Sequence, residues 1–281
     1  MKTSISTYSF GKYNDILGID GVIEKAAEIG FEAIEFVDGP WTNDLDPAVA
    51  AACRKKAESL GLELSAYCTG NDFLDTANET FEDKISRLKK HVDFAALLGV
   101  KGMRHDVSYS APGRSYDAVL PILAEGCRQV AEYAKGKGIF TMTENHGWFS
   151  QDSDRVEKLY NAVNHENFGL LVDIGNFMCA DEEPKRAVGI TAKYARHVHC
   201  KDFIFKKGTE MNPGNGWFET RGGDYIRGTI LGHGVVPVPQ CLRVLQKYGY
   251  DGYVTIEFEG VEDNLLGIAW SLDFLKRCLG K

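Results

Sequence analysis

The chain has 281 residues and a formal charge of −8, with 32 Lys and Arg against 40 Asp and Glu. This excess of acidic residues argues against non-specific binding of nucleic acid, which needs a basic surface that contacts the phosphate backbone. Apolar residues make up 44 % of the chain and aromatic residues 11 %, which is enough for a buried core and argues against a disordered chain.

The sequence also indicates a compartment. It has no run of about 18 apolar residues, so we expect no membrane-spanning helix. The first residues, MKTSISTYSFGKYND, lack the apolar stretch of a secretory signal. The seven Cys are scattered, odd in number and free of CxxC pairs, which is typical of reduced thiols rather than disulfides or a zinc knuckle. We therefore expect a cytoplasmic protein.

Short β-rich runs alternate with longer helical patterns from one end of the chain to the other. The expected strands are Thr3–Tyr8, Ala33–Val37, Glu63–Cys68, Val100–Asp106, Ile139–Asn145, Phe168–Asp173, His197–Asp202 and Tyr253–Phe258. The expected helices are Gly21–Ile29, Pro47–Ser59, Phe81–Leu98, Tyr116–Lys135, Asp152–Val163, Glu183–Tyr194, Pro239–Lys247 and Asn264–Cys278. Several of these helices end in glycine, which tolerates the left-handed conformation that stops a helix.

Eight such units of about 35 residues predict a closed (β/α)8 TIM barrel, in one domain over residues 1–281. An open doubly wound sheet is the alternative, but its first turn should carry a glycine-rich phosphate loop. The corresponding turn here reads YSFGKY. The connection at residues 203–236 is longer than ordinary barrel loops, and we expect a lid-like insertion at the catalytic face after the seventh strand.

Four residues of metal-ligand type fall at the ends of the last four expected strands. They are Glu144 in MTENHG, Asp173 in LLVDIGN, His199 in HVHCKD and Glu257 in VTIEFEG. Catalytic groups of a barrel gather at the carboxyl ends of its strands. A single acidic residue at such a place is usually a helix cap or a solvated loop residue, but four at equivalent places predict one hard divalent ion. We expect Mn²⁺ first, with Mg²⁺, Co²⁺ or Zn²⁺ as alternatives.

Strand alternation adds candidates, because residues i and i+2 share a face. If Glu144 and His199 point inward, so do His146 and Lys201, which we take as catalytic candidates for proton transfer and for stabilising an enolate oxygen. A loop histidine bonded to the backbone is the alternative for His146. On the fourth strand either Arg104 with Asp106, or His105, lines the pocket.

Further candidates lie outside these strands. Glu35 is another inward carboxylate, for which a structural salt bridge is an equal alternative. Trp148, in the loop after the fifth strand, is a candidate for substrate contact. In the long insertion, Arg221, Arg227 and His233 are candidates for substrate or phosphate binding. They could equally pack the lid onto the barrel or form an oligomer contact.

These residues resemble a known group. The set Glu144, Asp173, His199 and Glu257, with the strings ENHG, VDIGN, HVHCKD and IEFEG, looks like the xylose isomerase-like sugar phosphate isomerase/epimerase superfamily over nearly the whole chain. The resemblance implies a barrel with one divalent metal, often Mn²⁺, that acts on ketoses, inosoles or related polyols. In the ketose epimerases of this group the two metal-bound glutamates exchange the proton, and these roles would fall on Glu144 and Glu257.

The sequence also departs from that pattern. Those epimerases commonly have a His at the position of Asn176, a candidate substrate contact here, and a Gly-acidic-Gly segment where this chain reads Gly232-His233-Gly234. These differences count against plain ketose 3-epimerisation. The strings ENHG and RGTILGHG look similar to the metal subunits of enzymes that cleave 3-oxo-glycosides, including C-glycoside deglycosidases. In those enzymes the residue matching His146 is the proposed base.

All these outcomes share one step, in which a base removes the proton next to a metal-bound carbonyl and a metal-stabilised enediolate forms. We expect first a sugar isomerase or epimerase acting on a ketose or related keto-sugar. The alternatives are a lyase or keto-polyol dehydratase that expels a β-substituent, and a barrel that binds sugar without turnover. The expected partners are a small sugar or glycoside and further copies of the chain, or a second subunit if it is a deglycosidase. No nucleic acid or membrane partner is expected.

Overall fold

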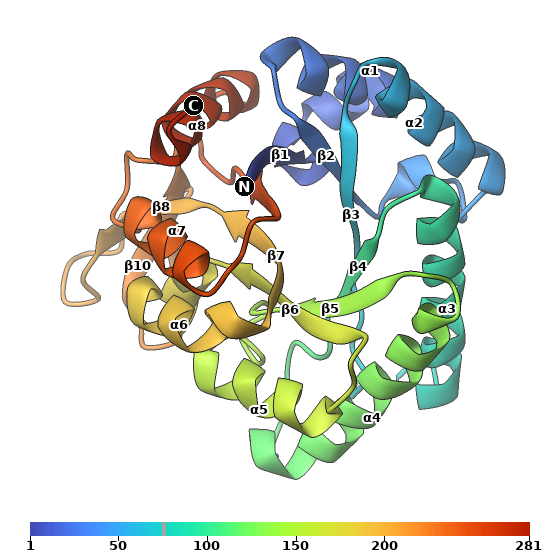
Figure 1. Ribbon diagram of the computed structural model, residues 1–281. Coiled ribbons are helices and arrows are strands. Elements are labelled where there is room, and N and C mark those ends of the chain that lie inside the picture. Colours follow the sequence, from blue (N-terminus) through green and yellow to red (C-terminus); the bar gives the residue numbers. More distant parts are fainter. Residues whose placement is uncertain (75–76) are drawn as a thin grey trace.

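The structure is a computed structural model that describes residues 1–74 and 77–281. Eight parallel strands close into a barrel, in the order β1-β11-β7-β6-β5-β4-β3-β2, with helices around the outside (Figure 1). The barrel strands are β1 (Lys2–Ser6), β2 (Ala33–Val37), β3 (Glu63–Thr69), β4 (Gly102–His105), β5 (Phe140–Glu144), β6 (Phe168–Asp173), β7 (Ala195–Cys200) and β11 (Tyr253–Ile256). The predicted (β/α)8 fold is confirmed.

The helices follow the strands in the expected alternation and cover the outer face of the sheet. They are α1 (Tyr13–Ile29), α2 (Pro47–Ser59), α3 (Phe81–Leu98), α4 (Tyr116–Lys135), α5 (Ser153–Val163), α6 (Pro184–Thr191), α7 (Val238–Lys247) and α8 (Asn264–Leu279). Ile85, Leu88 and Val92 of α3 are buried at helical spacing, so this helix turns one apolar face to the strands. Within the described residues no helix has the length and apolar character to cross a bilayer.

A small apolar cluster fills the inside of the barrel. It consists of Ala66, Cys68, Met142 and Leu171, all buried. Met142 precedes Glu144 by two residues, and Leu171 precedes Asp173 by two residues, so each pair lies on one face of its strand. The apolar layer therefore closes the barrel directly below the polar residues at its carboxyl end.

Several predicted boundaries differ from the structure, among them His197–Asp202, where β7 spans Ala195–Cys200, and Tyr253–Phe258, where β11 ends at Ile256. Two of the differences have clear local reasons. Helix α1 begins at Tyr13 rather than Gly21, and Gly18 interrupts it with a φ of 63°, a conformation that glycine adopts without strain. Strand β1 ends at Ser6 rather than Tyr8, because Thr7–Phe10 turns into a short 3₁₀ helix. The hydroxyl of Thr7 holds that turn against β2 by accepting a hydrogen bond of 2.9 Å from the N–H of Val37.

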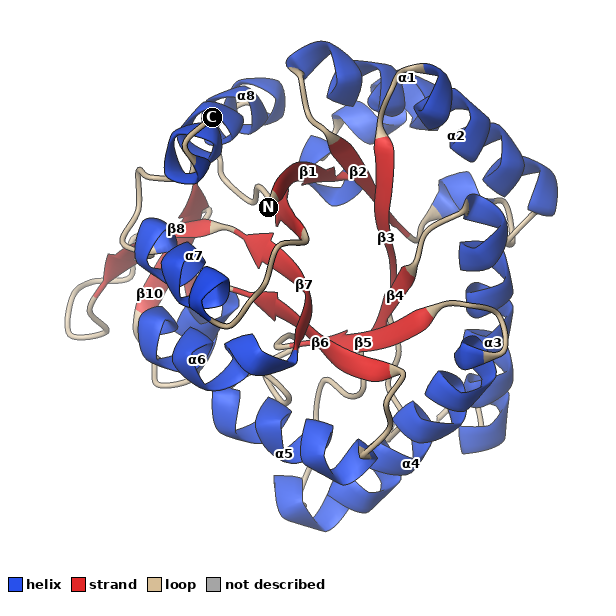
Figure 2. Cartoon of the chain, viewed as in Figure 1, coloured by secondary structure: helices blue, strands red, loops and turns tan. Residues whose placement is uncertain are grey.

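The long connection after β7 folds into a small antiparallel sheet in the order β8-β10-β9. Its strands are β8 (Asp202–Lys206), β9 (Phe218–Glu219) and β10 (Tyr225–Thr229). Figure 2 shows this sheet outside the barrel, beside α7. The N–H of Arg221 donates to the carbonyl of Cys179 (2.8 Å), and the hydroxyl of Thr229 donates to Glu262 (2.7 Å). The insertion is therefore tied to the segments that follow β6 and β11.

Candidate metal centre and cavity

The four residues of metal-ligand type converge at the carboxyl end of the barrel. Glu144 and Asp173 are the last residues of β5 and β6, His199 lies near the end of β7, and Glu257 directly follows β11. These strands are consecutive neighbours in the barrel, so their ends meet on one side. One donor atom from each of the four residues lies within 4.8 Å of the others.

The donor atoms fit a divalent ion. From Nδ1 of His199 the distances are 3.7 Å to Glu144 Oε1, 3.9 Å to Asp173 Oδ2 and 3.7 Å to Glu257 Oε2. These separations are too long for hydrogen bonds. Among the described residues, His199 Nδ1 is buried without a hydrogen-bond partner, and Asp173 Oδ2 is buried with no hydrogen bond but with an ion-pair contact to Lys201 at 3.2 Å. Three carboxylates and one imidazole facing a common point, with such unsatisfied atoms, suit an ion of the Mg²⁺, Mn²⁺ or Zn²⁺ kind.

The backbone orients Asp173. Its Oδ1 atom accepts hydrogen bonds from the N–H groups of Gly175 (2.8 Å) and Asn176 (2.9 Å), so that Oδ2 faces the other donors. Burial, reinforced by Glu144 and Glu257 and partly offset by Lys201, raises the pKa of Asp173 to about 6. A positive charge at this point would hold the carboxylate in its ionised form.

Both oxygens of Glu144 have partners. Asn176 Nδ2 donates to Oε1 at 2.9 Å, and the Arg104 guanidinium lies 2.6 Å from Oε2. Burial alone would raise the pKa of Glu144, but Arg104 and then His199 outweigh it and lower the pKa. Glu144 is thus held as a carboxylate, and Asn176 contacts this glutamate directly.

Lys201 is surrounded by carboxylates. It forms an ion pair with Glu257, and its Nζ lies 3.0 Å from Glu259 Oε1 and 3.2 Å from Asp173 Oδ2. Burial would lower the pKa of Lys201, but these carboxylates raise it well above its usual value. Lys201 therefore remains an ammonium at the edge of the donor cluster, on the side of β7 and β11.

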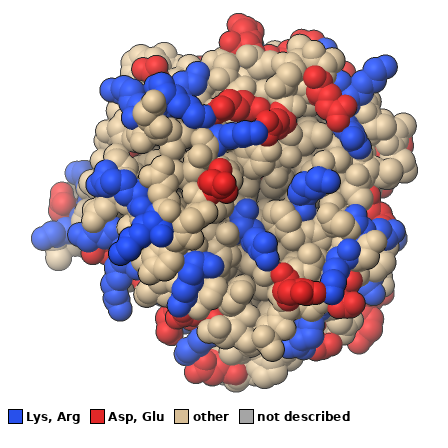
Figure 3. Space-filling model, viewed as in Figure 1, with Lys and Arg blue, Asp and Glu red and all other residues tan. Residues whose placement is uncertain are grey.

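A cavity of about 170 Å³ opens onto three of the four donor residues, Glu144, His199 and Glu257. Its lining consists of Tyr8, Val37, Cys68, Arg104, Glu144, His146, His199, Glu257 and Glu259. Figure 3 shows that both acidic and basic side chains are exposed on the face of the molecule that it draws. The cavity offers both charges and several hydrogen-bonding groups, which suits a small polyhydroxylated ligand.

His146 is held at the cavity by Asp106. The Nδ1 atom of His146 donates to Asp106 Oδ1 at 2.9 Å, while the hydroxyl of Tyr109 donates to Oδ2 at 2.8 Å. Burial lowers the pKa of His146, but the nearby Asp106 outweighs it and raises the pKa. Burial likewise opposes the ionisation of Asp106, yet Arg104 and His146 lower its pKa to about 2. His146 is thus fixed through its Nδ1 atom at the edge of the cavity.

Other candidates from the sequence lie away from the cavity. His105 is on the opposite face of β4 from Arg104, packed edge-on against Phe73. Trp148 is 43 % exposed and packs against Phe218 of the insertion. His233 lies beside Trp270 of α8, where both line a separate hollow.

The two arginines of the insertion have structural contacts. Arg221 donates to Asp152 at 2.7 Å and to the carbonyl of Trp148, so its guanidinium ties the insertion to the start of α5. Arg227 stacks over the ring of Trp217 with 5.5 Å to the centroid. Neither residue lines the cavity. The packing alternative describes Arg221 better than phosphate binding does.

Sequence reasoning did not single out Glu259, Tyr8 or Tyr109 as site residues. Glu259 could have been found, because it lies two residues beyond Glu257 and so continues the same face. Asp106 had been predicted together with Arg104, as one of two alternatives for the face of the fourth strand that lines the pocket. Tyr8 lies in the short 3₁₀ helix after β1 and Tyr109 in the loop after β4, and no periodicity in the sequence reveals where these side chains point.

The chain is similar in sequence to characterised enzymes. The inosose dehydratase of Clostridium perfringens (strain 13 / Type A) is 24% identical over 252 residues, which cover 84% of this chain and 81% of that protein. The 3-oxo-isoapionate decarboxylase of Pectobacterium atrosepticum is 24% identical over 242 residues, covering 84% and 78%.

Solved structures agree on the fold. The D-allulose 3-epimerase from Methylomonas sp. has a TM-score of 0.75 at 17% identity, covering 99% of this chain and 98% of that chain. A xylose isomerase-like TIM barrel protein from Mycobacterium smegmatis, in complex with magnesium, has a TM-score of 0.75 at 19% identity, covering 99% and 96%. The family model for the xylose isomerase-like TIM barrel matches residues 23–278. The resemblance seen in the sequence is thus confirmed, and the chain belongs to the xylose isomerase-like TIM barrel family.

Proposed function

We propose that the protein is a divalent-metal-dependent lyase that removes the proton next to the carbonyl of a keto-sugar or keto-polyol and then expels a β-substituent. The observation that carries this proposal is the convergence of four donor atoms within 4.8 Å beside a cavity that also holds His146. An ion held by Glu144, Asp173, His199 and Glu257 would polarise the substrate carbonyl and acidify the neighbouring C–H bond.

His146 is the group best suited to accept the proton. Its Nδ1 is fixed by Asp106, so Nε2 can take up the proton while the imidazolium is stabilised by the carboxylate. Glu144 is less suited to this task, because Arg104 and Asn176 occupy its two oxygens and keep it ionised. The ion pair with Lys201 restricts Glu257 in the same way.

The two sides of the donor cluster carry different proton-transfer groups, an imidazole on one side and an ammonium on the other. His146 follows β5, whereas the Lys201 ammonium lies between Glu257 and Glu259 on the β7 and β11 side. A base on one side and a cation on the other suit elimination, in which the cation stabilises a developing oxygen charge. The names of the two curated relatives, a dehydratase and a decarboxylase, support a reaction that breaks a bond beside a carbonyl.

Substrate size follows from the cavity. At about 170 Å³ it is smaller than the roughly 300–1,000 Å³ of pockets for drug-sized ligands, so a monosaccharide-sized ring fits the proposal better than a long oligosaccharide.

Epimerisation is a second candidate, and one observation favours it. Glu144 and Glu257 each lie 3.7 Å from His199 Nδ1 and face the same space, so they would flank a substrate held there. Proton exchange between two flanking carboxylates would invert a carbon rather than expel a group.

Proton NMR in D₂O separates the two. The ion-loaded protein is incubated with inososes, 3-oxo-glucosides and ketoses. Release of water or aglycone supports the lyase, whereas solvent deuterium in an intact substrate supports the epimerase. His146→Gln should lower the rate by about 10²–10⁴-fold. His165→Gln is the control and should leave this rate unchanged, because the imidazole of His165 pairs with Glu132 away from the cavity. If no substrate of these classes exchanges a proton or loses a group, the proposal is wrong.

A further inference from the structure

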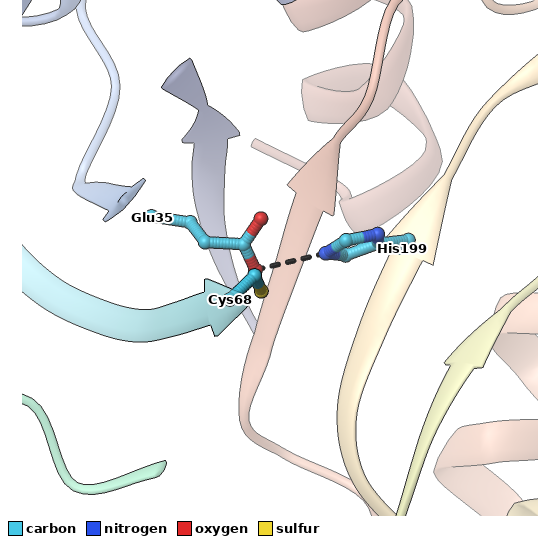
Figure 4. A group of neighbouring side chains, drawn as sticks. All are labelled: Glu35, Cys68 and His199. Carbon is cyan, nitrogen blue, oxygen red and sulfur yellow. Dashed lines mark hydrogen bonds and ion pairs between the residues drawn. The ribbon is translucent and has the colours of Figure 1, made fainter. Parts of the chain in front are cut away.

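Glu35 of β2 is a carboxylate buried inside the barrel, with an exposed fraction of 0 %. Its Oε2 atom accepts a hydrogen bond from His199 Nε2 at 2.8 Å and lies 3.0 Å from His197 Nε2. Figure 4 shows Glu35 and His199 reaching toward each other from separate strands, with Cys68 beside them. A buried charge is costly unless it is paired, so this contact calls for a role.

The two ring nitrogens of His199 face different partners. Nδ1 faces Glu144, Asp173 and Glu257, and Nε2 faces Glu35. A neutral imidazole carries a single N–H, and the nitrogen without it has the lone pair that a metal needs. A carboxylate can accept a hydrogen bond but cannot donate one, so Glu35 selects the tautomer with the proton on Nε2.

We propose that Glu35 is a positioning residue for the metal centre. It holds His199 in the Nε2–H tautomer and fixes the ring, so that the Nδ1 lone pair points at the three carboxylates. The inference rests on the proposed metal dependence and adds a fifth residue, on β2, to the four donors. A carboxylate that orients a ligating histidine typically changes metal affinity 10–100-fold.

A second ion between Glu35, Cys68 and His199 is the competing interpretation, because donor atoms of these three residues lie within 4.8 Å of one another. The contact of 2.8 Å between His199 Nε2 and Glu35 Oε2 is an ordinary hydrogen-bond length. A proton is therefore shared between these two atoms, and an ion bound by both would have to separate them.

The first test is a Co²⁺ titration followed by visible absorption, which reads binding without any substrate. Glu35→Gln keeps the size of the side chain and removes its charge, and it should weaken Co²⁺ binding about 10–100-fold. Thr255→Val is the matched control, because Thr255 contacts His197 in the same buried layer (2.8 Å). This control should bind Co²⁺ as the unaltered protein does, and circular dichroism checks that both variants are folded.

The second test needs no variant at Glu35. In the Zn²⁺-loaded protein, ¹⁵N-labelled histidine distinguishes a ring protonated on Nε2 from one protonated on Nδ1, and His199→Asn identifies the signal. We expect the proton on Nε2 and the metal on Nδ1. A metal on Nε2 would overturn the inference even if Glu35→Gln failed to fold.

The outcomes separate the two proposals. If the unaltered protein binds no ion, the proposed function fails and this inference fails with it. If it binds Co²⁺ and Glu35→Gln binds equally well, or Thr255→Val loses as much affinity, only the role of Glu35 is overturned. Two ions per chain with a thiolate-to-cobalt charge-transfer band would instead support the competing site at Cys68.

Discussion

At the scale of single residues, Asp106 stands between the metal ligands and the proposed base. Its carboxylate accepts hydrogen bonds from His146 and Tyr109. It also forms an ion pair with Arg104 at 3.0 Å, and Arg104 forms a second ion pair with Glu144. Asp106→Asn removes the charge that stabilises an imidazolium at His146, so we expect kcat to fall about 10²-fold with little change in KM. Steady-state kinetics with a turned-over keto-sugar measure this. An unchanged kcat would contradict the proposed roles of His146 and Asp106 in proton transfer.

His105, the neighbour of Asp106, makes a different prediction, because it is fully buried on the other face of β4. Burial lowers the pKa of His105 to about 4, from an ordinary value of about 6.5. Below pH 6.5 the unfolded chain therefore binds a proton that the folded chain does not, and stability falls as the pH drops toward 4. Between pH 7 and pH 5 this loss should be about 2 kcal/mol.

Urea unfolding at pH 7 and at pH 5 tests this linkage. His105→Gln should lower the free energy of unfolding at both pH values but remove about 2 kcal/mol of the difference between them. The other titrating groups are common to both proteins and cancel in the comparison. An equal pH dependence in the two proteins would show that His105 is protonated in the folded chain.

At the scale of elements, one carboxylate organises the connection between β10 and α7. Asp202 accepts hydrogen bonds of 2.8–2.9 Å from four backbone N–H groups: Phe203, Gly232, Gly234 and Val236. The turn packs so closely that a Cβ at Gly234 would lie 2.2 Å from Asp202 Oδ1. The close packing against Asp202 explains why glycine occupies position 234 of the Gly232-His233-Gly234 segment, which the sequence alone did not explain.

Asp202→Ala would leave these N–H groups without their acceptor. We expect the free energy of unfolding to fall by about 3 kcal/mol or more, since each buried unsatisfied group costs roughly 1–3 kcal/mol. Asp224→Ala is the control, because its exposed carboxylate accepts a single bond from Gly208, and it should cost less than about 1 kcal/mol. Equal losses in urea denaturation would contradict the organising role of Asp202.

Elements with a strong period were predictable from the sequence. The predicted Pro47–Ser59, Phe81–Leu98 and Tyr116–Lys135 are helices with those same bounds. The small sheet of the insertion was not predicted, because β9 has only two residues and β8 pairs with β10 across a long connection. The grouping of the four donors followed from parallel strands ending on one side of a barrel.

The contact between Asp106 and His146 was not predictable in the same way. It depends on which face of β4 turns inward, and a single sequence left Arg104 with Asp106, or His105, as equal choices. Glu35 was ambiguous for a similar reason, since its partners come from β7, three places along the barrel from β2. Contacts across the interior of a barrel are set by closure, which local periodicity does not encode.

At the scale of the whole molecule, the four donors join β5, β6, β7 and β11, which are half of the barrel. Their three carboxylates lie close together at a buried point, so an ion that binds only the folded chain should stabilise the entire barrel. At an ion concentration of 100 times Kd the gain should be about 2.7 kcal/mol. For a chain of this size, that corresponds to a rise in Tm of about 5 °C.

Scanning calorimetry with and without a chelator measures the shift for Mn²⁺, Mg²⁺, Co²⁺ and Zn²⁺ in turn. Asp173→Asn removes one donor oxygen and should lose the rise in Tm, whereas Asp224→Asn, on the exposed insertion, should keep it. The size of the shift at equal concentration ranks the four ions by affinity, which donor type alone does not do. A Tm that none of the four ions raises in the unaltered protein would mean that these side chains converge for a reason other than metal binding.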